Sequence, residues 1–107
     1  MGYESEELMI GIHFTEEEFK QKADYFNVPE HIVDGLWLYL NNRIEPGGFL
    51  EAVLSNNLKE AFGRADHINI SKMFETVQFL YNCFPSIAWG SEEKFNNWIK
   101  NSQTEEN

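Results

Sequence analysis

The chain has 107 residues, enough for one domain, and 42% of them are hydrophobic and 15% aromatic. This apolar content excludes a disordered chain, and the net charge of −10 disfavours binding to nucleic-acid polymers or anionic membranes. Cys83 is the single cysteine, no apolar run reaches membrane-spanning length, and the start lacks the pattern of a signal peptide, so we expect a cytoplasmic protein without disulfides.

The first half of the chain predicts three short helices. Thr15 followed by three glutamates is typical of a capping box at a helix start. Pro29 suits the first position of a second helix, whose apolar residues recur at three and four positions. The sequence Pro46-Gly47-Gly48 predicts a sharp turn before a third helix. These helices are expected near residues 15–26, 29–41 and 49–54.

The second half predicts three more helices. Ser55, Ser71 and Ser91 are expected to cap them, and residues 66–70 are expected to form a connector. Gly63 lies inside the fourth helix, where we expect close backbone packing, because glycine otherwise costs a helix about 1 kcal/mol relative to alanine. These helices are expected near residues 56–65, 71–84 and 91–100.

Together these elements predict a compact all-α bundle of five to six short helices in a single domain. Residues 1–14 would form an N-terminal arm, 15–100 the helical domain, and 101–107 a disordered acidic tail. Apolar stripes predict burial of five large side chains: Trp37, Leu40, Phe62, Leu80 and Trp98. The aromatic excess in so small a body predicts a symmetric homo-oligomer, either a dimer or a tetramer.

No catalytic or metal-binding pattern is evident. His13, His31 and His67 are scattered without ligand spacing, so we expect no metal. The acidic run at residues 16–18 is explained by helix capping, and Cys83 is expected to be a small buried apolar residue without a cation to activate it. We therefore expect no enzymatic activity and no cofactor.

The negative charge is unevenly distributed. Residues 1–40 hold nine acids against two lysines, whereas residues 41–72 are neutral and contain both arginines. A small anionic ligand would be held best in this middle third. Arg64 and Lys59 are either ordinary surface charges or ligand contacts, and Trp89 either covers the core or offers a stacking platform. The turn at Gly47-Gly48 resembles a phosphate-binding loop only weakly.

Two stretches, PGGFLEAVLSNNLKEAFGRAD and LYNCFPSIAWGS, resemble the motifs of a widespread family of small phage and prophage proteins. The resemblance covers residues 29–98 and leaves the first 28 outside. The family pattern has a glycine before its tryptophan, where this chain has Ile87-Ala88, so the shape of that loop is in question.

The family also looks like the phage sponges that counter cyclic-oligonucleotide immunity (anti-CBASS proteins). That resemblance implies a non-enzymatic immune-evasion protein that sequesters a cyclic dinucleotide inside an oligomer. Such a site needs aromatic faces for bases, cations for phosphates and amides for base edges. Candidate ligand-binding positions are Asn56, Asn57, Lys59, Arg64, Tyr81 and Trp89.

A second hypothesis is an acidic inhibitor of a host protein. The net charge of −7 over residues 1–40 favours it, because an acidic face can mimic nucleic acid toward a DNA-binding target.

Overall fold

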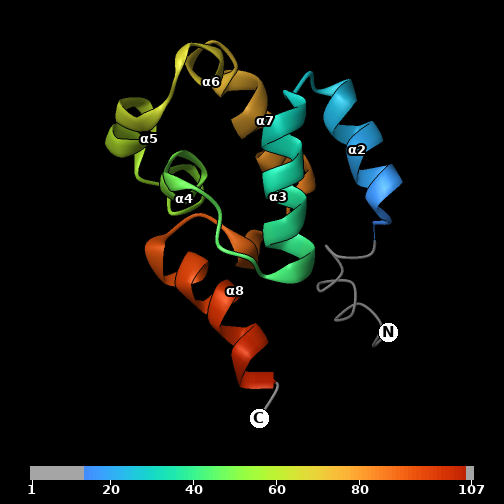
Figure 1. The fold of residues 1–107 in the computed structure, drawn as a ribbon, viewed down its shortest axis with the longest axis vertical. Helices are drawn as coiled ribbons and strands as arrows, with labels where there is room; N and C mark the ends of the chain where they lie inside the picture. The colour runs from blue at the N-terminus through green and yellow to red at the C-terminus, as the bar shows by residue number, and fades with distance from the viewer. Residues whose placement is uncertain (1–13, 106–107) are drawn as a thin grey trace.

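The computed structural model describes the backbone of residues 14–105 and the side chains of residues 14–100. These residues form seven α-helices and a 3-10 turn, and no strand occurs among them, so the expected all-α fold is confirmed (Figure 1). The elements are α2 (Glu16–Tyr25), α3 (Glu30–Asn42), α4 (Gly48–Leu54), α5 (Leu58–Arg64), α6 (His67–Ser71), α7 (Met73–Cys83), η2 (Ser86–Ala88) and α8 (Glu92–Glu105). The N-terminal arm expected at residues 1–14 lies almost wholly outside the described residues.

Helix α3 is the centre of the fold, with α2 and α4 on either side of it and α8 near its C-terminal end (Figure 1). Its apolar positions recur at three and four residues, so one broad face is buried. Near the end of α3, the Tyr39 hydroxyl donates to the Ala88 carbonyl oxygen at 2.6 Å, and the Trp98 indole donates to the Tyr39 carbonyl oxygen at 2.9 Å. The end of α3 thereby holds both η2 and α8.

Two of the four expected side-chain caps are confirmed. Thr15 and Glu18 form the predicted capping box, and Ser91 accepts a hydrogen bond from the Lys94 backbone N–H. The expected cap at Ser55 is wrong, because Asn57 caps α5 by accepting from the Glu60 backbone N–H at 3.2 Å. Ser55 instead ends α4 as its C-cap.

The connector expected at residues 66–70 is also wrong. Asp66 accepts from the Asn69 backbone N–H at 2.8 Å and caps the short helix α6. Ser71 ends this helix, and α7 begins at Met73 instead. Asn69 is buried and its side-chain oxygen lies 2.9 Å from His31 Nε2, so α6 is joined to α3 by a contact that sequence spacing does not reveal.

The last helix is longer than expected. The backbone of α8 continues to Glu105, five residues past the predicted end and into the tail expected to be disordered. Residues 101–105 contain neither glycine nor proline, so nothing in their backbone preferences stops the helix. Residues 106 and 107 lie outside the described part of the chain.

Three of the five side chains that the sequence predicts to be buried are buried in the structure. Leu40, Leu80 and Trp98 are buried, while Trp37 is half-buried at the edge of the core. The predictions for Phe62 and Gly63 are wrong: Phe62 is 44% exposed, and a Cβ added at Gly63 would meet no atom within 4 Å. Helix α5 therefore buries only Ala61 fully and leaves a wide apolar surface uncovered.

No helix within residues 14–105 has both the length and the apolar character needed to cross a bilayer.

Candidate functional site

The structure brings together three of the six residues expected to bind a ligand. A polar hollow of about 460 Å³ lies beside the link between α4 and α5, and Asn56, Asn57 and Arg64 line it. Lys59 and Tyr81 do not line this hollow. Glu51 and Glu92 line it as well, so two carboxylates share the hollow with Arg64, the one cation among the described residues that line it.

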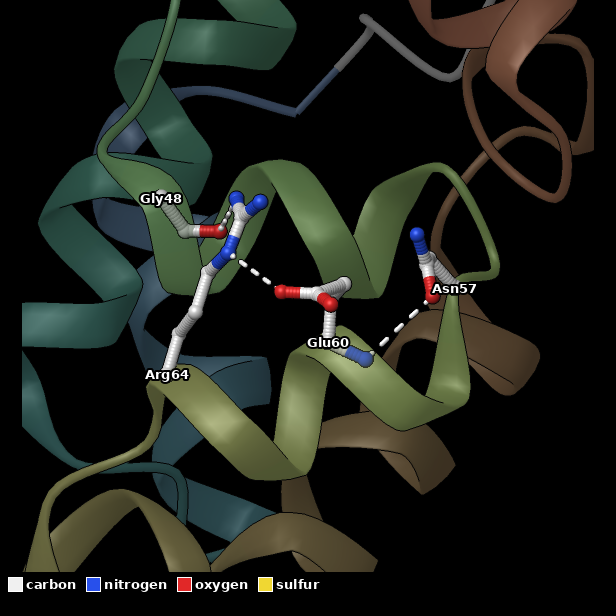
Figure 2. A network of polar contacts seen from close by, with 4 residues as sticks. All are labelled: Gly48, Asn57, Glu60 and Arg64. Atoms are coloured by element: carbon white, nitrogen blue, oxygen red, sulfur yellow. Dashed lines mark hydrogen bonds and ion pairs between the residues drawn. The ribbon is translucent and has the colours of Figure 1, made fainter.

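The guanidinium of Arg64 already forms hydrogen bonds within the protein (Figure 2). Its Nε donates to Glu60 Oε1 at 3.2 Å, one helical turn earlier, and a terminal nitrogen donates to the Gly48 carbonyl oxygen at 3.1 Å. The guanidinium thus joins the end of α5 to the start of α4. Any anion that binds here has to replace these partners or share them.

The two asparagines also have structural roles. The side-chain oxygen of Asn57 caps α5, which leaves its amide nitrogen for other partners. Asn56 lies in the left-handed region at φ 63°, a conformation that asparagine tolerates better than most residues. Both are exposed, and the link between α4 and α5 presents them side by side.

The side chain of Trp89 packs against the hydrophobic core and covers part of it. It is half-buried against the core residues and lines a small hollow of about 120 Å³ together with residues of α4, α5 and α7. The neighbouring Gly90 N–H donates to the Leu54 carbonyl oxygen at 2.8 Å, which ties this loop to the end of α4. Asn56 and Asn57 line this hollow too, but Arg64 lines only the polar one.

The side chain of Arg43, the other arginine, packs against Trp98. Its guanidinium carbon lies 3.8 Å from the centroid of the Trp98 ring, and it donates to the Trp98 carbonyl oxygen at 3.0 Å. Arg43 therefore anchors α8 and leaves Arg64 as the only arginine near the polar hollow.

The acidic residues of positions 14–40 gather on α2 and α3. Six carboxylates on these helices are exposed: Glu16, Glu17, Glu18, Asp24, Glu30 and Asp34. A groove of about 420 Å³ lies between the two helices, with Val28 and Val33 among its lining and Glu17, Asp24 and Glu30 around them. We call these six residues the acidic face.

A second surface was missed by reasoning from the sequence. Five large apolar side chains on α5 and α7 are exposed: Leu58, Phe62, Phe74, Val77 and Tyr81. We call them the apolar face. The sequence did contain a sign of this surface, because α7 has more apolar residues than one buried side of a helix can hold. Apolar periodicity alone, however, does not show which side of the helix packs against the core.

Metal ligation and the cysteine thiol are the two sources of chemistry that the titratable side chains allow us to compare. Within the described residues, no three His, Cys, Asp or Glu side chains are grouped as a metal site would require. Burial raises the pKa of the Cys83 thiol, and the nearby charge of Lys22 opposes this only partly. A nucleophilic role would need the opposite shift.

Comparison with protein-family models, with curated proteins and with solved structures finds no match to this chain.

Proposed function

We propose that this protein acts by binding rather than by catalysis, and that its acidic face binds a basic surface of another protein. The observation that carries the proposal is the gathering of six exposed carboxylates on two adjacent helices, three of which line the groove between these helices. Apolar contacts surrounded by charged side chains are typical of protein recognition.

The charge of this face is not neutralised locally. Two lysines, Lys20 and Lys22, accompany the six carboxylates, giving a net charge of −4 over residues 14–40. Lys20 lies 3.3 Å from Glu16 and 3.5 Å from Asp34 and so holds α2 against α3. The remaining carboxylates attract basic partners over several ångströms and repel nucleic acid. A DNA-binding host protein suits this charge, with the acidic face standing in for phosphates.

The test is retention of basic proteins from a bacterial extract by the immobilised chain. The variant Glu17→Gln/Asp24→Asn/Glu30→Gln removes three charges around the groove. The control Glu45→Gln/Glu92→Gln/Glu93→Gln removes three exposed charges elsewhere. We expect a basic protein that the wild type and the control retain, that the groove variant loses, and that elutes with rising salt. Equal retention by both variants would contradict the proposal.

A second candidate function is sequestration of a cyclic dinucleotide, supported by the position of Asn56, Asn57 and Arg64 around one polar hollow. The carboxylates of Glu51 and Glu92 oppose a dianionic ligand there, and Arg64 has partners of its own. For these reasons we rank this function second.

Thermal shift against a panel of cyclic dinucleotides tests it, because a ligand of the folded state raises the melting temperature. If one binds, Arg64→Ala should weaken affinity about tenfold or more through loss of a charge-assisted contact. Lys59→Ala is the matched control, since it removes a cation from the same helix but outside the hollow.

Two further measurements complete the test. Trp89→Ala should lower the melting temperature of the protein. Recovery of intact nucleotide after the protein is denatured would distinguish binding from hydrolysis.

A further inference from the structure

We propose that the apolar face formed by α5 and α7 binds a second copy of this chain, with the two α7 helices antiparallel across a twofold axis. This inference is independent of the acidic face and of the polar hollow.

The apolar face is too exposed for a chain that stays alone. Phe74 is 70% exposed, Tyr81 79% and Leu58 69%. The side chains of α5 and α7 adjoin, because Leu58 and Val77 line the same small hollow. Soluble monomers rarely expose a contiguous apolar patch that joins two helices, and such patches mark interaction sites.

The spacing along α7 favours a helix as the opposing surface. Phe74, Val77 and Tyr81 are separated by three and four residues, so they lie on one side of α7 over two turns. In an isologous pair, residue i meets residue j and residue j meets residue i. Antiparallel α7 helices would then place Phe74 against Tyr81 of the second copy, with Val77 beside the axis.

The charge distribution favours a second copy of the chain as the occupant. Residues 58–81 contain three acids and three bases, so the rest of the chain carries the whole net charge of −10. Two such chains repel each other through most of their surfaces, and the apolar face is where contact brings the least repulsion. A basic foreign protein would instead be attracted to the acidic face, because the apolar face offers it no net charge.

Light scattering after size exclusion tests the association at tens of micromolar. We expect about 25 kDa for the wild type, twice the 12.5 kDa of one chain. Phe74→Glu should shift the protein to the monomer mass, since a charge would be placed against Tyr81 of the second copy in an apolar interface. Tyr25→Glu is the matched control, because Tyr25 is 79% exposed but lies on α2, and it should remain dimeric. Circular dichroism shows that each variant is folded.

Cross-linking tests the position of Val77 beside the twofold axis. In a Cys83→Ser background, Val77→Cys should form a disulfide-linked dimer in oxidised glutathione, whereas Tyr25→Cys should not. Raising the salt concentration should strengthen the dimer by screening the repulsion of two acidic chains, whereas it should weaken binding at the acidic face. A wild-type mass of 12.5 kDa at 100 micromolar would overturn the proposal, as would a Phe74→Glu variant that remains dimeric.

Discussion

Tyr39 shows how much of the fold depends on one side chain. Its ring stacks on Phe95 at 5.4 Å between centroids and on Phe84 at 6.3 Å, and its hydroxyl donates to the Ala88 carbonyl oxygen. It is fully buried, and this burial raises the pKa of the phenol. Because the phenolate is disfavoured in the folded state, the folded protein keeps this proton at pH values where the unfolded chain loses it.

The first prediction concerns the alkaline stability of the protein. The Tyr39 pKa is higher in the folded state, so its contribution to stability is complete below the unfolded value of about 10 and falls as the pH rises above it. Tyr39→Phe should flatten this part of the stability curve. At neutral pH the same change should cost about 1–3 kcal/mol, because the Ala88 carbonyl loses its donor. Urea unfolding at pH 7 and at pH 10–11 measures both effects. An unchanged alkaline slope in the variant would contradict the assignment.

The second prediction concerns Thr76, which is fully buried in α7 while its hydroxyl oxygen has no hydrogen-bond partner within the described residues. An unpaired buried hydroxyl is destabilising. Thr76→Val keeps the shape and removes that hydroxyl, so we expect stabilisation of about 1 kcal/mol. Thr76→Ser keeps the hydroxyl, removes a methyl group and should be less stable than the wild type. The melting temperatures of the wild type and the two variants rank their stabilities. A valine variant less stable than the wild type would show that the Thr76 hydroxyl has a hydrogen-bond partner in solution.

Among the elements, the glycines of α3 and α5 differ in a way that their sequence context does not show. A Cβ added at Gly35 would lie 2.9 Å from Leu50 Cδ1, so α3 and α4 approach closely there. Gly63, where the sequence suggested close packing, faces open space instead. A side chain at position 35 would therefore require Leu50 to move, whereas one at position 63 would meet nothing.

The third prediction follows from this difference. Gly63→Ala should stabilise the protein by about 0.5–1 kcal/mol, because alanine favours the helix and meets no obstacle. Gly35→Ala should gain less or should destabilise, since Leu50 must move to accommodate the methyl group. The midpoint of urea unfolding ranks the two variants. A more stable Gly35→Ala than Gly63→Ala would refute the close approach of α3 and α4.

At the scale of the whole molecule, the charge of −10 is confined to the parts of the chain outside residues 58–81. The acidic face gathers much of it on α2 and α3, while the apolar face is neutral. The molecule thus has two surfaces of different chemistry, one suited to a basic partner and one to self-association.

The fourth prediction concerns salt. Self-repulsion among excess carboxylates lowers the stability of the folded state, and salt screens it, with a Debye length of about 30 Å at 0.01 M and about 8 Å at 0.15 M. The melting temperature should therefore rise as sodium chloride increases from 10 to 200 mM. The groove variant Glu17→Gln/Asp24→Asn/Glu30→Gln should show a smaller rise. A melting temperature that falls with salt would mean that the ion pairs of the fold outweigh this repulsion.

The sequence by itself determined the helical class and most helix starts, because caps and apolar spacing are local properties. It also identified the acidic N-terminal part, since charge can be counted without coordinates. It could not predict α6, whose five residues carry no full apolar period and are held through the contact between Asn69 and His31.

Only the tertiary structure decided which apolar residues are covered and which polar groups are free. Phe62 and Leu80 both lie on apolar stripes, yet one is exposed and the other buried, because burial depends on which helix lies opposite. Arg64 and Asn57 have the chemistry of ligand contacts, but both already form hydrogen bonds within the fold. Their bonds with Glu60 lie within one turn of α5, whereas the bond from Arg64 to the Gly48 carbonyl oxygen joins two helices and depends on how α4 and α5 pack.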